Sequence, residues 1–525
     1  MLASPPVTAF ALALILAASP VAFPNSGAIA AQPSFLRGLT ALHNFQYEEA
    51  ALAFREAQRI DRDFAMAYWG EAMAFNQTLW LNQDAETARA VLLRLAPTPE
   101  ARRAKAGSDR EKGYLRAVEI LFGSGEPRAR NGAYADAMGT LAAAHPKDLE
   151  AACFHALALM GTMARSPALF GEAGDDGHAH ALVGSAVQAR VAAILQRVLA
   201  RNPDHPGALH YLIHDYDDPV HARQALPAAR GYAKVAPQSS HALHMPAHIF
   251  LQLGLWDDAA ASDEASFLAS EAWVKREGLP IGMRDHHSLS WLLYESLQQG
   301  RFQKARQTLD LMRPAVDATG AARLKALLSD MRARYVVETR SFQELAGAKD
   351  FGTTGELFAI GMSAARRGDS RVAALALAEL ARRAGPGEPR GTARRGIDVA
   401  VMERELAAVV ALAGGRGAEA MARMREAVAL ERQLPPPLGL PRPIKPASEL
   451  FGEILLELGR PREAAAEFER TLGRWPNRSL ALLGLARASA AGGDRESARR
   501  HYRRFLANWK GADPGLPETK EAQAY

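Results

Sequence analysis

Small and apolar residues recur along the chain at the spacing of helix faces, whereas segments that alternate apolar and polar positions, as strands do, are few. Gly38 and Phe54 are separated by 16 residues, and the same interval separates Gly452 from Phe468. A small residue at such a position lets two helices of a pair approach closely. The pattern predicts a nearly all-helical protein built from closely packed helix pairs.

The helical pattern also repeats along the chain. Tyr502 follows Phe468 by 34 residues, and Pro237 follows Pro203 by the same interval. Proline ends a helix because it lacks a backbone N–H group, so the two prolines mark equivalent boundaries. A period of this length predicts tandem helix-turn-helix units, each packed on its neighbours.

These residues resemble the consensus of the tetratricopeptide repeat (TPR) family. That consensus has a small residue at position 8, where Gly38 and Gly452 stand, and an aromatic or apolar residue at position 24, where Phe54 and Phe468 stand. The resemblance implies an all-α fold in which tandem helix-turn-helix repeats stack into a right-handed solenoid. It also implies that positions 2, 5 and 9 of each first helix line a concave, ligand-binding groove.

Four longer segments are similar to a group of exported bacterial TPR proteins whose biochemical role is not settled. These segments are Phe64–Met73, Leu209–His214, His241–Phe250 and Ser448–Gly459. In that group Asn-His-Pro-Leu-Trp occurs where this chain has Asn76-Gln-Thr-Leu-Trp80, so one histidine of the group is missing here.

The chain begins with a segment that resembles an export signal. Val7 to Ala18 form an apolar run of suitable length, and Ala28-Ile-Ala30 has the small-x-small form of a cleavage site. A short uncleaved anchor is the alternative. No later stretch reaches the ~20 apolar residues that span a bilayer. We expect a soluble protein, periplasmic or secreted, with no membrane segment after signal cleavage.

Breaker-rich segments divide the remaining chain. The expected parts are a signal peptide over 1–31, a TPR-like helical solenoid over 32–432, a proline-rich linker over 433–446, a C-terminal TPR pair over 447–510 and a loosely wrapped tail over 511–525. Six prolines make the linker an extended, semi-rigid spacer between the two helical parts. Glycine-rich loops are expected over 165–187 and 384–396.

Charge and motif content narrow the possible functions. The net charge is +5, basic residues are interspersed with acidic ones, and no aromatic-rich basic module is present, so nucleic-acid binding is not expected. Cys153 is the single cysteine, which excludes an intrachain disulfide. The Gly-rich phosphate-binding loop and the Gly-x-Ser-x-Gly nucleophile motif are both absent. An interaction protein is therefore expected rather than an enzyme, and the sequence leaves its oligomeric state open.

Seven of the 15 histidines lie between residues 205 and 248. His210 and His214 recur 34 residues later as His244 and His248. Residues four apart lie on one helix face, with Cβ atoms about 5–6 Å apart. In the register that the TPR resemblance implies, both pairs face the concave groove, so four imidazoles are expected within reach of one ion.

Histidine is the commonest metal ligand, and imidazole suits Zn, Cu, Ni and Fe. We therefore predict a divalent transition-metal site at the four histidines. The additional candidate ligands are His241, His287 and Asp285, and the candidate groove residues are Asp215, Asp217 and Asp218. Acidic residues near histidines act either as ligands or as acceptors that fix the imidazole tautomers.

Pro246 affects the geometry of this candidate site. Proline is tolerated in the first turn of a helix, so the helix is expected to begin near 242–245, with His241 in the preceding turn. The histidines outside this region, among them His43 and His155, are isolated in the sequence and are interpreted as structural, and so is His205.

Three interpretations of the histidine pairs remain open at this point: metal binding, recognition of a peptide without metal, and packing. His210-x-x-x-His214 lacks the glutamate of a metalloprotease motif. The predicted function is an exported TPR scaffold that binds a protein or peptide in its groove, with a histidine-bound metal as one possible component. The alternative is a metal-dependent enzyme or a metal carrier that uses the four histidines.

Overall fold

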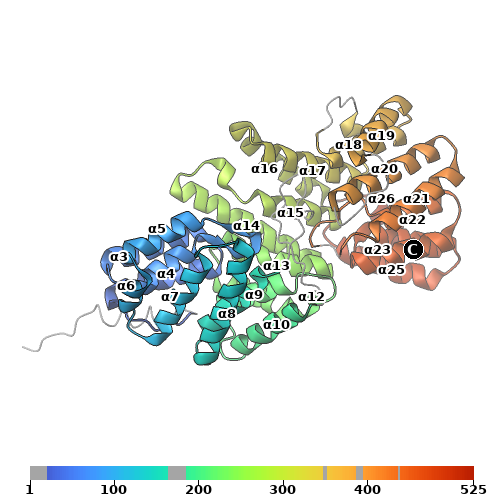
Figure 1. Cartoon of the computed structure of the whole chain (residues 1–525). Helices are drawn as coiled ribbons and strands as arrows, with labels where there is room; N and C mark the ends of the chain where they lie inside the picture. The colour runs from blue at the N-terminus through green and yellow to red at the C-terminus, as the bar shows by residue number, and fades with distance from the viewer. Residues whose placement is uncertain (1–20, 164–184, 347–351, 386–393, 436–437) are drawn as a thin grey trace, which may run out of the picture. The chain divides into compact units, whose positions relative to one another are not determined.

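The computed structural model describes residues 21–163, 185–346, 352–385, 394–435 and 438–525 (Figure 1). These residues form two compact units. Unit 1 holds residues 21–163, 185–216 and 224–246, and unit 2 holds residues 217–223 and the described residues from 247 onward. The expected loops at 165–187 and 384–396 and the apolar run over 7–18 lie largely or wholly outside the described residues.

Nearly all elements are helices, as predicted. The elements through α13 are η1 (Ile29–Ala31), α2 (Gln32–His43), α3 (Tyr47–Ile60), α4 (Ala65–Met73), β1 (Asn76–Gln77), η2 (Thr78–Trp80), β2 (Asn82–Gln83), α5 (Ala85–Leu95), α6 (Pro99–Ala104), α7 (Asp109–Leu121), α8 (Pro127–Ala144), α9 (Leu149–Gly161), α10 (Ala186–Leu199), α11 (Pro206–Asp215), α12 (Ala222–Val235) and α13 (Ser240–Leu253). The two strands form one short antiparallel ladder.

Unit 2 continues with helical pairs to the C-terminus. Its elements are α14 (Trp256–Glu277), η4 (Ile281–Met283), α15 (His286–Gln298), α16 (Phe302–Thr319), α17 (Ala322–Thr339), η5 (Phe342–Leu345), α18 (Thr354–Arg366), α19 (Ser370–Ala384), α20 (Arg394–Ala413), α21 (Gly417–Glu431), α22 (Ala447–Glu457), α23 (Pro461–Arg474), α24 (Ser479–Ala491), α25 (Arg495–Asn508) and α26 (Pro517–Ala524). In the described part of the chain, no helix is both long enough and apolar enough to cross a bilayer.

The close packing predicted from the glycine–phenylalanine interval is present in both units. In unit 1, a Cβ atom at Gly38 would lie 2.9 Å from the ring of Phe54. In unit 2, a Cβ atom at Gly452 would lie 2.8 Å from the ring of Phe468, which is fully buried. Only glycine admits helices this close, because a methyl group would overlap the ring. The repeat register inferred from the sequence is therefore confirmed in the pairs α2–α3 and α22–α23.

The pairs α22–α23 and α24–α25 share the same turn, and α2–α3 has a variant of it. Gly459 and Gly493 stand two residues before α23 and α25 and have φ angles of 70° and 84°. Glycine adopts this left-handed conformation without steric cost and so ends the preceding helix. The corresponding residue before α3 is Phe45, with φ of 57°. A side chain makes this conformation cost about 1–2 kcal/mol, so other contacts must hold Phe45 there.

The proline-rich segment has no helix in its described residues, as predicted, since α21 ends at Glu431 and α22 begins at Ala447. It does not separate two helical bodies, however. Ile444 is buried in the apolar core that unit 2 shares from Phe267 to Ala488. Lys445 is also buried, and its Nζ donates to Glu449 at 2.6 Å. The division into units therefore does not fall at 433–446, because this segment packs as an integral part of unit 2.

A buried arginine accounts for the continuity of unit 2 across that segment. The guanidinium group of Arg478, which immediately precedes α24, is fully buried and donates to Glu449 at 2.7 and 2.9 Å. It also donates to Glu338 at 2.5 Å and to the hydroxyl of Tyr294 at 3.0 Å. A buried charge persists only when it is paired and hydrogen-bonded. These contacts join the start of α24 to α15, α17 and α22, a long-range pairing that local sequence patterns do not reveal.

The C-terminal tail is more regular than expected. Its helix, α26, places Glu521 against α25 and α24. Glu521 accepts a hydrogen bond from the hydroxyl of Tyr502 at 2.7 Å and pairs with Arg487 at 2.6 Å.

Candidate functional site

Three histidine side chains of unit 1 converge on one point. His210 and His214 lie one turn apart on α11, which begins at Pro206 directly after its capping residue, His205. His241 lies in the first turn of α13. One ligand nitrogen from each of the three histidines lies within 4.8 Å of the other two. We call His210, His214 and His241 the imidazole triad.

The distances in the imidazole triad suit a shared ion. Nε2 of His210 lies 3.0 Å from Nε2 of His241 and 3.0 Å from Nε2 of His214. Two nitrogens bound to one tetrahedral zinc ion at 2.0–2.1 Å are about 3.3 Å apart. His210 and His214 are fully buried and His241 is half-buried. Solvent therefore reaches the triad at His241.

A backbone contact fixes the tautomer of His210. Its Nδ1 lies 2.7 Å from the carbonyl oxygen of His43. A carbonyl oxygen can only accept, so Nδ1 carries the proton and donates it. The lone pair is then on Nε2, which faces His214 and His241. Histidines that bind metals typically donate their second ring N–H to a carbonyl or carboxylate in this way.

Phe45 lies against all three members of the triad. Its ring centroid is 4.3 Å from that of His210, 5.7 Å from that of His214 and 5.8 Å from that of His241. Tyr232 also stacks on His210, with centroids 5.0 Å apart and an interplanar angle of 15°. These contacts hold Phe45 in the left-handed conformation that glycine adopts in the C-terminal repeats. In the sequence, Phe45 could be recognised only as an aromatic residue at a turn position where the C-terminal repeats have glycine.

The start of α13 corrects one expectation. The helix spans Ser240–Leu253, so Pro246 lies inside it and not in its first turn. The missed start signal is Ser239, whose Oγ accepts from the backbone N–H of Ala242 at 3.3 Å. A serine cap of this kind satisfies an unpaired N–H group at the helix start. The earlier start places His241 on the helix, where the sequence analysis had left it in the preceding turn.

The second histidine pair has an acidic partner. Nδ1 of His248 lies 2.7 Å from Oδ2 of Asp217, and Gln252 donates to the other oxygen of this carboxylate at 3.3 Å. Asp217 therefore orients His248, which is the tautomer-fixing role predicted for acidic residues near the groove. The ring of His287 lies 6.5 Å from that of His248, and Trp291 lies 4.4 Å from it. All five residues belong to unit 2.

His244 is buried on α13, one turn before His248. The boundary between the two units passes through α13 after Pro246, so His244 belongs to unit 1 and His248 to unit 2. The convergence of His210, His214, His244 and His248 on one ion stays a prediction.

The other predicted acidic residues make structural contacts. Asp218 accepts from the backbone N–H of His221 at 2.9 Å and lies 2.9 Å from Nδ1 of the same residue. Asp285 caps α15 by accepting from the backbone N–H of Ser288 at 3.0 Å. Asp215 is the buried last residue of α11. Turns and caps already occupy oxygens of Asp218 and Asp285, so these carboxylates are weaker ligand candidates than the imidazoles.

A second cluster in unit 1 consists of residues that looked isolated in the sequence. Glu150 lies fully buried in the first turn of α9, with Oε2 2.6 Å from Nε2 of His43 and Oε1 3.2 Å from Nε2 of His205. Nδ1 of His43 lies 2.9 Å from the hydroxyl of Tyr211. Nδ1 of His205 accepts from the backbone N–H of Ala208 at 3.3 Å. We call His43, Glu150 and His205 the carboxylate cluster.

The protons of the carboxylate cluster can be assigned. Since Nδ1 of His205 accepts, its proton is on Nε2 and is donated to Glu150. Burial lowers the pKa of His43 and keeps the ring neutral, so its Nδ1 accepts a hydrogen bond from the hydroxyl of Tyr211 and its Nε2 donates to Glu150. Burial alone would raise the pKa of Glu150, but the two imidazole partners hold it well below its usual value. This network is complete without a metal.

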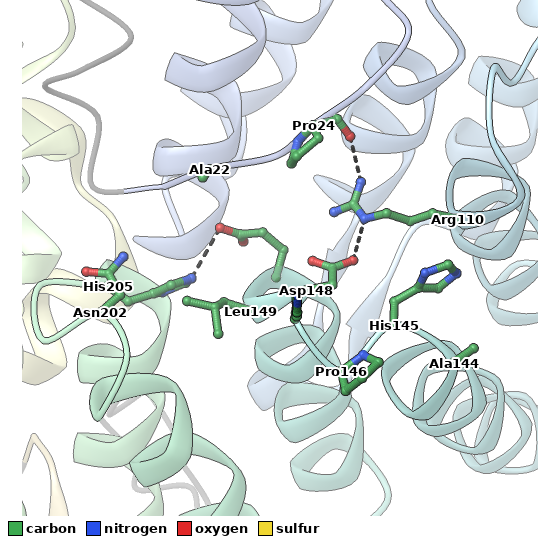
Figure 2. Close-up of a pocket in the computed structure, with 12 residues that line it drawn as sticks. Ala22, Pro24, Arg110, Ala144, His145, Pro146, Asp148, Leu149, Asn202 and His205 are labelled. Carbon is green, nitrogen blue, oxygen red and sulfur yellow. Dashed lines mark hydrogen bonds and ion pairs between the residues drawn. The ribbon is translucent and has the colours of Figure 1, made fainter.

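A pocket of about 560 Å³ opens beside the carboxylate cluster (Figure 2). Glu150, His205, Arg110 and Asp148 contribute to its wall. Arg110 donates to Asp148 at 2.6 Å and to the carbonyl oxygen of Pro24 at 2.8 Å. These charges are paired with one another, and the N-terminal segment forms part of the wall.

The sequence pattern of the tetratricopeptide repeat family matches residues 450–517. This range contains Gly452 and Phe468 and most of the helices α22 to α25. Residues 450–517 thus carry a tetratricopeptide-repeat sequence. The predicted all-α TPR fold is confirmed, and the closer similarity to an exported TPR group stays a prediction.

Solved structures of low sequence identity are similar to this chain over most of its length. Yeast Tom70 is 12% identical, with 96% of this chain and 94% of that chain covered and a TM-score of 0.31. The Cut9–Hcn1 hetero-tetramer of the APC/C is 12% identical, with 98% of this chain and 80% of that chain covered and a TM-score of 0.30. A human IFIT1 dimer with PPP-AAAA is 12% identical, with 90% of this chain and 95% of that chain covered and a TM-score of 0.33. A comparison with curated proteins gives no match.

Proposed function

We propose that the chain is an exported TPR scaffold for a protein or peptide partner, and that a divalent metal held by the imidazole triad is part of its binding site. Stacked helical repeats offer extended surfaces for partner binding. The metal part rests on one observation: the Nε2 atoms of His214 and His241 each lie 3.0 Å from Nε2 of His210.

Three histidine ligands favour Zn, Cu, Ni or Fe over Mg or Ca, which prefer oxygen ligands. A tetrahedral ion with three protein ligands keeps one position open. Since solvent reaches the triad at His241, a side chain of the partner could occupy that position. The metal would then join the scaffold to its partner without a large rearrangement of the helices.

A metal carrier or metal-dependent enzyme is the second candidate. The complete burial of His210 and His214 favours it, because a folded partner reaches a buried ion poorly. In that case the open position would hold water, whose pKa on zinc falls to about 7. An enzyme would also need a base, and the stretch from His210 to His214 does not supply the glutamate of a metalloprotease.

Metal analysis of the exported protein tests the metal part. The protein is purified without a histidine tag and without chelator, and its bound metals are measured by mass spectrometry. We expect close to one transition-metal ion per chain in the wild type and a large loss in His214→Ala. A metal-free wild type that also fails to take up added Zn, Cu, Ni or Fe would reject the metal and leave the peptide scaffold.

Site-specific photo-crosslinking tests the partner. A photoreactive residue at Trp80, whose ring lies 6.3 Å from that of His241, is compared with one at Leu52, which is 63% exposed in the same unit. We expect an adduct from position 80 that weakens when metal is chelated, and none from position 52. Metal binding without any adduct would favour the carrier or enzyme.

A further inference from the structure

The segment Val21–Ala31 belongs to the core of unit 1. Val21 and Phe23 are 3% and 4% exposed. The ring of Phe23 lies 5.2 Å from that of Phe35, 5.5 Å from that of Trp69 and 5.0 Å from that of Tyr114. These three residues come from α2, α4 and α7, so Phe23 fills a space between three helices.

Polar contacts hold the same segment along its whole length. The guanidinium group of Arg110 lies 4.2 Å from the centre of the ring of Phe23. The same group donates to the carbonyl oxygen of Pro24, as Figure 2 shows. Ser26 donates twice to the buried carboxylate of Glu111, from its backbone nitrogen at 2.7 Å and from its hydroxyl at 2.8 Å.

The contacts continue up to the expected cleavage motif. The backbone N–H of Ala28 donates to Asp61 at 2.8 Å. A Cβ atom at Gly27 would lie 2.5 Å from the ring of Phe64, so the backbone there runs directly over that ring. Ala31 ends η1 and is fully buried.

We propose that Val21–Ala31 is a permanent strap of the folded protein, and that export processing cuts the chain before Val21. Cleavage after Ala30 would remove Phe23 from among three aromatic rings and leave Glu111 without its contacts to Ser26. A large apolar side chain lost from a core leaves a cavity, and a buried carboxylate that loses two hydrogen bonds is destabilising. The proposal uses the export half of the proposed function but does not depend on a bound metal.

The first test reads the N-terminus of the full chain expressed in an exporting bacterium. Mass spectrometry of the soluble periplasmic protein should give a first residue at or before Val21. A stable periplasmic protein that begins at Ala31 or Gln32 would overturn the proposal. An intact Met1 on cytoplasmic protein would reject export, and the strap would then be judged by the second test.

The second test compares unfolding of a chain that begins at Val21 with one that begins at Gln32. Removing the strap should lower the melting temperature by about 10 °C, given the cost of losing a buried aromatic residue. Phe23→Ala in the longer chain should produce a similar fall. Ile29→Ala is the matched control, because Ile29 is 71% exposed in the same segment. Equal melting of the two chains would show that the segment is dispensable and reject the strap.

Discussion

Unit 1 contains two histidine clusters with different chemistry. In the carboxylate cluster, the imidazoles of His43 and His205 both donate to Glu150, and the nearer contact is 2.6 Å long. In the imidazole triad, nitrogens face nitrogens at 3.0 Å. In the first arrangement one carboxylate accepts from both imidazoles, whereas in the second the lone pair on Nε2 of His210 faces two other imidazoles. The partner of a buried histidine, and not its burial, therefore indicates whether it is available to a metal.

His43 links the two clusters. Its side chain lies 2.6 Å from Glu150, and its carbonyl oxygen lies 2.7 Å from Nδ1 of His210. The carboxylate cluster thereby holds the backbone that fixes the tautomer of a metal-ligand candidate. The carboxylate cluster therefore stabilises the backbone that keeps the imidazole triad in position.

The largest expected effect comes from opening the carboxylate cluster. Glu150→Ala removes the acceptor of two buried imidazole N–H groups, so the free energy of unfolding should fall by about 3–5 kcal/mol. Denaturant unfolding at neutral pH measures this. Glu86→Ala, at an exposed position of unit 1, is the control and should change stability by less than about 0.5 kcal/mol. A fall below about 1 kcal/mol for Glu150→Ala would show that the cluster is not structural.

Metal should stabilise only a protein with an intact triad. Zinc at 100 times its dissociation constant should add about 2.7 kcal/mol to the stability of the wild type by mass action. His214→Ala should remove this gain, and so should the double variant His214→Ala/His248→Ala, without loss of metal-free helical content. Thermal melts by circular dichroism with and without Zn, Cu, Ni and Fe provide the measurement. An equal shift in wild type and variants would place the metal elsewhere.

Acid should weaken the contribution of His43 to stability before the carboxylate of Glu150 titrates. The pKa of His43 is lowered by burial, so the unfolded chain binds its proton more readily than the folded chain. The contribution of His43 to the free energy of unfolding is complete above the pKa that this residue has in the unfolded chain, near 6.5. It is lost as the pH falls below that value, by at most about 1.4 kcal/mol per pH unit. Unfolding of metal-free wild type and His43→Gln between pH 7.5 and 5.5 measures the difference. Parallel pH profiles would mean that His43 titrates normally in the fold.

The smallest effect concerns the turn beside the triad. Phe45→Ala and Phe45→Gly both lose the ring, but glycine relieves the left-handed backbone at φ of 57°. Phe45→Gly should therefore be about 1 kcal/mol more stable than Phe45→Ala, although glycine is usually the less stable of the two in a folded chain. Chemical denaturation of the two variants checks this difference. If alanine is the more stable replacement, the strain assigned to Phe45 is wrong.

The sequence predicted the repeat fold because its signals are local and periodic. Gly452 and Phe468 are close in sequence and in contact, and the His210–His214 pair follows from one helical turn. The carboxylate cluster could not be predicted, because Glu150 lies 107 residues after His43 and only the tertiary fold joins them. The continuity of unit 2 could not be predicted for the same reason, because it depends on the long-range pairing of Arg478 with Glu338.

X-ray absorption at the zinc edge of the zinc-loaded, tag-free protein tests the contrast between the two clusters most directly. If the imidazole triad holds the ion, the spectrum should show a shell of nitrogen neighbours at 2.0–2.1 Å with the scattering pattern of three imidazoles. His205→Gln should leave this spectrum unchanged, and His241→Ala should reduce the imidazole count. A spectrum with two imidazoles and a carboxylate oxygen, lost in His205→Gln, would place the metal in the carboxylate cluster and contradict the account.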